Sequence, residues 1–470
     1  MSDRAIGASF RDPSGFIYER DGQIYREVKR SYAADYDQLM SSGLYEVLTS
    51  KHLLVSHEEV EPVGAADADH HKTLRPEQVP FISYPYEWCF SELRDAALLT
   101  LRLQKLALAH DMTLKDASAY NIQFLNGRPV MIDTLSFARY EEGMAWVGYR
   151  QFCQHFLAPL ALMSRRDVRL LDLLRLHLDG VPLDLAVSML PMKTWLSRGL
   201  FMHLRVHARY QRKYEGKGDP AAESSEGSAS KAQVLSRAAL GNMVEDLRGV
   251  VRNLDWQPAG TEWAEYYCGD SYEEDSLAHK QELVRANLER LQPGVVWDLG
   301  ANTGVYSRIA AEVGAQVLSF DVDPACVERN YRNVRKEKLQ TLLPLRLDLV
   351  NPSPSQGWAH EERSSLAARA NADCVLALAL IHHIAISNNV PLDKIAQYFA
   401  RLANNLVIEF VPKSDAKVKT LLATREDVFP RYTREGFEAA FALYYKTLEA
   451  VPIRGSERVL YLLERVADPS

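Results

Sequence analysis

The sequence predicts an α/β protein with a doubly wound parallel sheet in its second half and a separate α+β domain in its first half. An apolar run, Val295–Asp298, ends in an acid and leads through a turn of small residues into an amphipathic helix pattern. From there onward, strand-like apolar runs alternate with helical patterns. The first half has hairpin signals and long helical patterns without that alternation.

Length and composition bound the class of protein. A chain of 470 residues exceeds the size of a single growing core, so two or three domains are expected. The formal net charge of −7 gives no overall signature of nucleic-acid binding. The five cysteines are scattered without paired spacing, which favours a reducing compartment and predicts no metal site. No run has signal-peptide or membrane-spanning character, so we expect a cytoplasmic protein with no membrane partner.

The first half opens with small β elements and continues with helices. Asp21-Gly22 lies between two aliphatic and aromatic runs and predicts a hairpin. Helical spacing follows over Ala33–Leu54, where Gly43 can split the segment into two helices. Phe81–Tyr84, bordered by prolines, is a strand candidate, and a long helix is expected over Ser91–His110.

The segment Leu114–Phe124, followed by a turn and a strand that ends at Asp133, carries a pattern of polar residues. Asp116 is followed five residues later by Asn121, and Asp133 comes after the next strand. This order is similar to the catalytic loop and metal-binding Asp of the protein-kinase and aminoglycoside-phosphotransferase superfamily. The resemblance implies Asp116 as base and Asn121 and Asp133 as magnesium ligands for Mg-ATP.

Departures from that pattern favour a degenerate, pseudokinase-like domain over catalysis. No glycine-rich phosphate loop precedes the motif, Leu-Lys stands before Asp116, and Thr-Leu follows Asp133. Lys29 is the one candidate for a nucleotide-binding lysine. The alternative interpretation is that these polar residues cap turns in a small α+β fold.

Four segments divide the chain: a kinase-like domain over 1–214, a flexible linker over 215–231, a helical connector and lid over 232–290, and the α/β domain over 291–470. The helix predicted over 193–214 interleaves basic and aromatic residues, which favours either a polyanion-binding surface or an ordinary half-solvated helix. Analogy with enzymes that place such a helix and its aromatic residues over a ligand site implies Tyr272 and Lys280 as candidates for the wall of an active site; the alternative is a structural lid without direct contacts.

Strands are expected in the second half at 295–298, 316–320, 341–347, 373–378, 405–410, 444–451 and 458–463. Acids stand at the ends of the first three, at Asp298, Asp321 and Asp348. In an open parallel sheet, ligands bind beyond the carboxyl ends of the strands. These carboxylates are therefore expected at one ligand site.

The order Asp298-x-Gly300-x-Asn302-x-Gly304, with Asp321 and Asp348, resembles the first three motifs of class I S-adenosylmethionine-dependent methyltransferases, which have a Rossmann-like fold. The resemblance implies that the glycines give the cofactor room, and that Asn302 takes a left-handed conformation in place of a glycine. Asp298 would accept from the cofactor's α-ammonium, Asp321 from the ribose hydroxyls and Asp348 from the adenine amino group. Asp323 competes with Asp321, and a nicotinamide enzyme remains the alternative.

The methyl acceptor is expected where the fourth and fifth strands of this sheet end. His382 and His383 are candidates to accept a proton, or else to shape the pocket by packing. Glu409, at the end of the fifth strand, is a candidate for acceptor binding or general base work, or else a structural carboxylate. No metal is predicted there.

Residues 84–88, 114–124, 132–137 and 409–415 together resemble a bacterial family of large methyltransferases, some described as nodulation-protein-like. The predicted function is methyl transfer to an oxygen or nitrogen of an unidentified acceptor, which is a small molecule, a glycan, a protein or an RNA. The alternatives are a bifunctional or kinase-like phosphotransferase, and a pseudokinase scaffold that recruits a partner.

Overall fold

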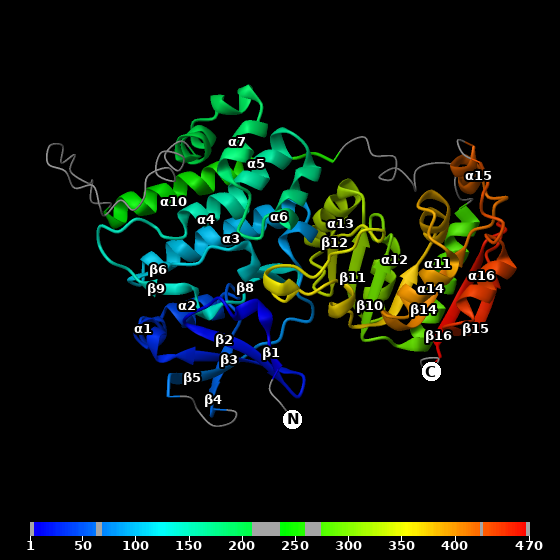
Figure 1. Ribbon diagram of the computed structural model, residues 1–470, viewed down its shortest axis with the longest axis horizontal. Coiled ribbons are helices and arrows are strands. Elements are labelled where there is room, and N and C mark those ends of the chain that lie inside the picture. Colours follow the sequence, from blue (N-terminus) through cyan, green and yellow to red (C-terminus); the bar gives the residue numbers. More distant parts are fainter. Residues whose placement is uncertain (1–3, 63–67, 209–235, 259–273, 424–425, 467–470) are drawn as a thin grey trace. The chain divides into compact units, whose positions relative to one another are not determined.

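The computed structural model describes residues 4–62, 68–208, 236–258, 274–423 and 426–466. The chain forms two compact units (Figure 1). The first contains Met1–Gln257 together with Gln356–Arg363, and the second contains Pro258–Ser355 and Ser364–Ser470. Among the described residues, no helix combines the length and the apolar character needed to cross a bilayer.

The first unit begins with a five-stranded antiparallel sheet in the order β1-β2-β3-β5-β4. The predicted hairpin is confirmed, because Asp21 and Gly22 have φ values of 52° and 75° and join paired strands. Two left-handed residues match the twist of a two-residue hairpin. The strands are β1 Arg4–Ala5, β2 Gly15–Arg20, β3 Gln23–Lys29, β4 His57–Val60 and β5 His70–Pro76.

Two short helices, α1 (Ala33–Ser41) and α2 (Leu44–Ser50), follow this sheet's first hairpin. Gly43, with φ 76°, separates them as predicted. The strand expected at Phe81–Tyr84 is wrong. Both the backbone N–H and the hydroxyl of Ser83 donate to Gln123 Oε1, so a side chain replaces a neighbouring strand.

The remainder of the first unit is mainly helical. After α5 (Ala158–Arg165) the chain does not form one long helix, because a 3-10 turn over Val168–Asp172 precedes the short α6 (Leu173–Leu176). The helix expected over 193–214 is present in part: a 3-10 turn over Met192–Leu196 ends before Ser197, and the chain is then helical from Arg198 to Ala208, with a π-helical segment at Phe201–Val206. The other elements are α3 Phe90–Leu108, β6 Met112–Leu114, β7 Ile122–Leu125, β8 Arg128–Met131, β9 Phe137–Arg139, α4 Tyr149–Phe152, α6 Leu173–Leu176, α7 Leu183–Met189, α8 Arg198–Leu200 and α10 Arg237–Arg252.

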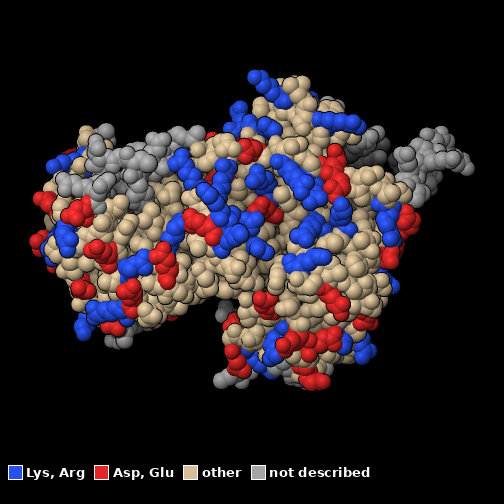
Figure 2. Space-filling view, turned by 180° about the vertical axis from the view of Figure 1, so that it is seen from behind, with Lys and Arg blue, Asp and Glu red and all other residues tan. Residues whose placement is uncertain are grey.

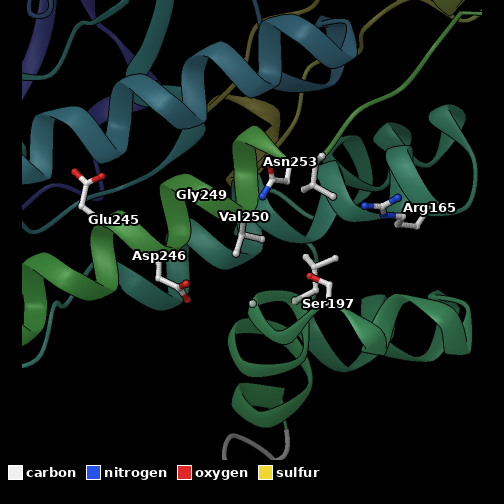
Figure 3. Close-up of a pocket in the computed structure, with 10 residues that line it drawn as sticks. Arg165, Ser197, Glu245, Asp246, Gly249, Val250 and Asn253 are labelled. Carbon is white, nitrogen blue, oxygen red and sulfur yellow. The ribbon is translucent and has the colours of Figure 1, made fainter.

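Close packing of α8 against α10 gives a testable contrast between two glycines. Figure 3 shows Val250 of α10 pointing toward the segment that holds Ser197. A Cβ on Gly199 would lie 2.1 Å from Val250 Cγ2, whereas a Cβ on Gly249 meets nothing within 4 Å. We expect Gly199→Ala to destabilise the unit by about 1–3 kcal/mol through overpacking. Gly249→Ala should stabilise it by about 0.5–1 kcal/mol in urea unfolding; equal effects would contradict this packing.

The second unit is built on a seven-stranded sheet in the order β12-β11-β10-β13-β14-β16-β15. Five strands are parallel, and β16 pairs antiparallel with β14 and β15. All seven predicted strands are confirmed, with small shifts at their ends. They are β10 Val295–Leu299, β11 Gln316–Asp321, β12 Leu342–Arg346, β13 Ala372–Ala377, β14 Ala403–Phe410, β15 Tyr445–Pro452 and β16 Val459–Arg465.

Helices connect these strands and bury their apolar sides against the sheet. Val284 and Leu288 of α11 join Tyr306 and Ile309 of α12 in one core with side chains from β10, β13 and β16. This packing holds the carboxyl ends of the strands in fixed register. The helices are α11 Glu274–Leu291, α12 Val305–Glu312, α13 Pro324–Glu337, α14 Leu392–Phe399, α15 Ala416–Leu422 and α16 Arg434–Phe441.

Candidate cofactor and acceptor cavity

A cavity of about 340 Å³ lies at the carboxyl ends of β10, β11, β12 and β13 in the second unit. Five of the six predicted cofactor residues line it: Asp298, Gly300, Asn302, Asp321 and Asp348. Apolar side chains from the ends of the same strands and from the loops after them complete most of the wall. The cavity therefore combines acidic groups with an apolar lining, as small-molecule sites do.

The turn after β10 supplies bare backbone at the cavity. Gly300 has φ 74°, and a Cβ there would approach Leu380 Cδ1 to 3.1 Å. Asn302 has φ 52°, the left-handed conformation expected of it. Its backbone N–H donates to Asp321 Oδ2 at 2.7 Å, so the second strand end holds the turn in place.

The interpretation of Gly304 needs correction. It was expected to make room for the cofactor, but it does not line the cavity. With φ 83°, it precedes α12, and a Cβ there would lie 2.5 Å from Asn330 Oδ1. Gly304 thus adopts the left-handed backbone conformation that precedes α12, and its lack of a side chain leaves room for Asn330.

Asp298 is a buried carboxylate at the end of β10. Its Oδ2 accepts from the Ser307 hydroxyl at 2.6 Å. Burial is the main cause that raises the pKa of Asp298 to about 6, with the charge of Asp321 adding to it. Among the described residues, no salt bridge reaches Asp298. A buried acid of this kind is a suitable partner for a ligand cation.

Asp321 occupies the corresponding end of β11. It accepts from the backbone N–H groups of Asn302 and Asp323, and burial raises the pKa of its carboxyl to about 6. The competing Asp323 accepts from Ala325 N at 2.8 Å, caps α13 and does not line the cavity. Geometry therefore favours Asp321 over Asp323 for contact with a ligand.

Asp348 follows β12 and lines the cavity beside Leu349 and Val350. Its Oδ1 accepts from Val350 N at 2.9 Å, which closes a tight turn. Leu347 N donates to the Asp321 backbone carbonyl, so this turn is tied to the neighbouring strand end. The three acids thus surround one space, although 50 residues of sequence separate the first from the last.

On the acceptor side, the two histidines differ. His383 lines the cavity, and burial, with the charges of Lys417 and Arg458, lowers its pKa to about 4. His382 is fully buried, does not line the cavity, and has a pKa held well below its ordinary value by burial. His383 is therefore neutral at pH 7 and positioned to meet a ligand, whereas His382 packs beneath it.

Glu409 also lies beneath the cavity. Its carboxylate contacts Lys280 Nζ at 2.5 Å and Arg458 Nη1 at 3.1 Å, and it is fully buried. Arg458 also forms a salt bridge with Asp415, with Nε 2.7 Å from Oδ2. A carboxylate shared by two buried cations is held as an anion that orients its neighbours, and the base role predicted for it has no geometric support.

What Glu409 orients is the cavity wall. Its Oε2 accepts from Ala379 N at 2.8 Å, and Ala379, which lines the cavity, has the uncommon φ of 50°. Lys280 lines the same cavity, as its place in the predicted lid suggested, and its pKa is lowered by burial. Tyr272 lies outside the described residues.

In the first unit, the three predicted kinase-like residues do come together. Asn121 Nδ2 and Asp133 Oδ2 both contact the Ser136 hydroxyl, and the side chain of Asn121 lies beside Asp116. Burial and the charge of Asp133 raise the pKa of Asp116. The resemblance to the kinase-like motif thus singled out three residues that the fold brings together.

The partners of Asp133 argue against a metal there. Arg26 Nη2 lies 3.0 Å from Asp133 Oδ1 and 2.5 Å from Asp12 Oδ2. The basic side chain that reaches Asp133 is therefore Arg26 and not Lys29. Within the described ranges, no group of three or more histidine, cysteine or acidic side chains is arranged to hold a metal ion.

The basic surface considered around 193–214 is only partly described. Arg205 stacks over Trp195, with its guanidinium carbon 5.2 Å from the ring centroid. Figure 2 shows basic and acidic side chains interspersed on the surface of the described residues. These observations fit a half-solvated helical surface.

Solved structures and a curated protein are similar to this chain. No protein-family model matches the chain. Among solved structures, the N-methyltransferase NodS from Bradyrhizobium japonicum WM9 is 10% identical, with a TM-score of 0.32, over 42% of this chain and 99% of that one. Magnesium protoporphyrin IX methyltransferase from Synechocystis PCC 6803 is 16% identical, with a TM-score of 0.30, over 44% and 94%.

Similarity to one curated protein extends over almost the whole chain. The nodulation protein NoeA of Rhizobium meliloti (strain 1021) is 36% identical over 467 residues, which cover 98% of this chain and 96% of that protein. The similarity therefore spans the sequence of both units. The chain belongs to the family of the nodulation protein NoeA.

Proposed function

We propose that the second unit binds S-adenosylmethionine and transfers its methyl group to an oxygen or nitrogen of an acceptor. The observation that carries this proposal is the single cavity into which the glycine turn, Asp298, Asp321 and Asp348 all open. Acids at successive ends of parallel strands suit a ligand with an ammonium group, a ribose and an adenine amino group. A nicotinamide enzyme, the alternative, fits the G-x-N-x-G turn less well.

The residues present fit this cofactor. In the part of the chain described, neither Asp298 nor Asp321 has a salt-bridge partner, and burial raises the pKa of both to about 6. A ligand ammonium beside Asp298 would stabilise the ionised carboxylate, and two ribose hydroxyls can donate to Asp321. Asp348 would hold the adenine amino group. When bound, the cofactor supplies an electrophilic methyl group on a sulfonium sulfur.

On the acceptor side, His383 is the proposed proton acceptor. Its imidazole is neutral at pH 7, because its pKa is about 4, and it faces the cavity. Glu409, which Lys280 contacts, accepts from Ala379 N and so fixes a turn that also lines the cavity. Bringing a nucleophile into line with the sulfonium methyl is the main requirement of this reaction.

Two neighbouring aspartates provide the test of the cofactor site. Asp321→Asn should weaken S-adenosylmethionine binding about 10- to 100-fold in calorimetry, because it removes charge-assisted hydrogen bonds. Asp323→Asn is the matched control, since asparagine also caps helices well, and it should leave the affinity unchanged. Wild-type protein that does not bind the cofactor, or equal effects of the two substitutions, would contradict the proposal.

The acceptor can be found by labelling. Cell-extract fractions incubated with the protein and methyl-labelled cofactor should incorporate label into one class of molecule: RNA, protein, glycan or small molecule. A His383→Ala variant that binds the cofactor normally should lose most of this incorporation. Undiminished labelling by that variant would remove His383 from the reaction.

For the first unit we propose no phosphoryl transfer with Mg-ATP. The salt bridge from Arg26 occupies the Asp133 carboxylate that a magnesium ion would need. We propose instead that this unit presents the acceptor or recruits a partner, the two roles left when phosphoryl transfer is set aside.

A further inference from the structure

Residues Gln356–Arg363, here called the strap, belong to the first unit, although the chain on both sides of them belongs to the second. The strap lies within the connection between β12 and β13, which end and begin at Arg346 and Ala372. The strap thus interrupts the connection between two strands that are consecutive in sequence in the parallel sheet. It therefore calls for a physical explanation.

The strap is anchored to the N-terminal part of the first unit by a buried acid. Glu362 Oε1 accepts from Arg11 Nη2 at 2.6 Å and Nε at 3.1 Å, and the Glu362 side chain is only 8% exposed. The backbone packs as closely, because a Cβ on Gly7 would lie 2.3 Å from the Glu361 carbonyl oxygen. A fork-like guanidinium contact gives this anchor a defined geometry.

A second set of contacts reaches the loop that holds the polar cluster. The Arg363 guanidinium lies over the Tyr120 ring, 4.2 Å from its centroid, and Gln356 Nε2 donates to the Arg175 carbonyl at 2.6 Å. Tyr120 directly precedes Asn121, which contacts Ser136 and Asp116. The strap is thus in contact with the residue next to the cluster.

The two ends of the strap are paired with each other, and so are the residues that flank them. Gln356 and Arg363 exchange backbone hydrogen bonds at 2.9 and 3.1 Å, and below them Leu366 N donates to the Ser353 carbonyl at 2.9 Å. Only five residues separate Gln356 from Val350, which lines the cofactor cavity with Asp348. A short, paired connection has little slack with which to absorb a movement at its base.

We propose that the strap couples occupancy of the cofactor cavity to the Tyr120–Asn121 loop of the first unit, which rests on the proposed function of that cavity. A ligand that contacts Asp348 favours one arrangement of the turn at 348–350. Because only five residues lie between this turn and the strap, the same arrangement favours one position of Arg363 on the Tyr120 ring. Coupling of this kind is the difference in ligand affinity between two arrangements, and it is reciprocal.

Hydrogen exchange measured by mass spectrometry tests this coupling in the full chain. S-adenosylhomocysteine, at a concentration that calorimetry shows to be saturating, should slow exchange in the peptide 117–125 by a factor of about five or more. Arg363→Ala and, separately, Arg11→Ala should abolish that change while leaving the ligand affinity within about threefold of wild type. Arg11 is largely exposed, so its loss should not unfold the unit.

Trp358→Ala is the matched control within the strap. Trp358 is 71% exposed, and only its backbone N–H contacts Glu362, so this variant should keep the full response. Normal ligand binding without a change in 117–125, or a change that survives both anchor substitutions, would overturn the coupling alone. Failure of wild type to bind S-adenosylhomocysteine would overturn the proposed function and the coupling with it.

Discussion

Replacing Glu409 with glutamine should destabilise the second unit by about 3–5 kcal/mol, the usual cost of breaking a buried ion pair. The substitution removes the negative charge that Lys280 and Arg458 both contact, while all three side chains remain buried. Glutamine still offers an oxygen to Ala379 N, so the loss should come from charge and not from volume. Urea unfolding, followed by circular dichroism, measures the difference.

Glu464 on β16 is the matched control for this substitution. It is exposed on a strand that pairs with the strand of Glu409, and Glu464→Gln should change the free energy of unfolding by less than about 0.5 kcal/mol. A Glu409→Gln protein of normal stability that binds cofactor but cannot transfer methyl groups would contradict the positioning role. That result would return Glu409 to the list of candidate bases.

Affinity for S-adenosylmethionine should fall steeply as the pH drops through about 6. Asp298 and Asp321 both have pKa values of about 6 in the free protein, because burial disfavours their charged forms. The ligand ammonium and hydroxyls require those charged forms. At pH 5 each carboxyl is about one-tenth ionised, so the affinity should be up to about 100-fold lower than at pH 7.5.

Stability of the free protein should respond to the same two groups in the opposite direction. Their folded pKa values lie above the unfolded value of about 3.9, so the folded state binds protons more tightly. Their contribution to stability is full below about pH 4 and is lost as the pH rises through 6.

Calorimetric titrations of S-adenosylmethionine between pH 5 and 8 measure the predicted change in affinity. An affinity that does not vary with pH over this range would contradict the assignment of both acids.

Much of the second unit could be predicted because its signals are local. The short apolar runs that end in Asp298 and Asp321 have the length and composition of buried strands. The turn that holds Gly300 and Asn302 needs left-handed backbone angles, which few other residues adopt readily. The resemblance added which group each acid would hold. The resemblance to a kinase-like motif likewise singled out Asp116, Asn121 and Asp133, which the structure brings together.

Other predictions failed where a distant partner decides the outcome. Phe81–Tyr84 has the composition of a strand, but Gln123 takes its hydrogen bonds. Gly304 stands in a cofactor motif, yet the side chain that needs its space is Asn330. Neither partner is adjacent in sequence, so no periodicity or spacing could have indicated it.

The sequence by itself determined which runs form buried strands, which turn exposes its backbone, and which acidic residues end those strands. Only the tertiary structure showed that Asp321 lines the cavity whereas Asp323, Glu409 and His382 do not. It also showed that Arg26 pairs with Asp133. It alone brought Gln356–Arg363 to the first unit. Burial, ion pairing and close packing depend on residues far apart in the chain, and their positions are set only when the whole chain folds.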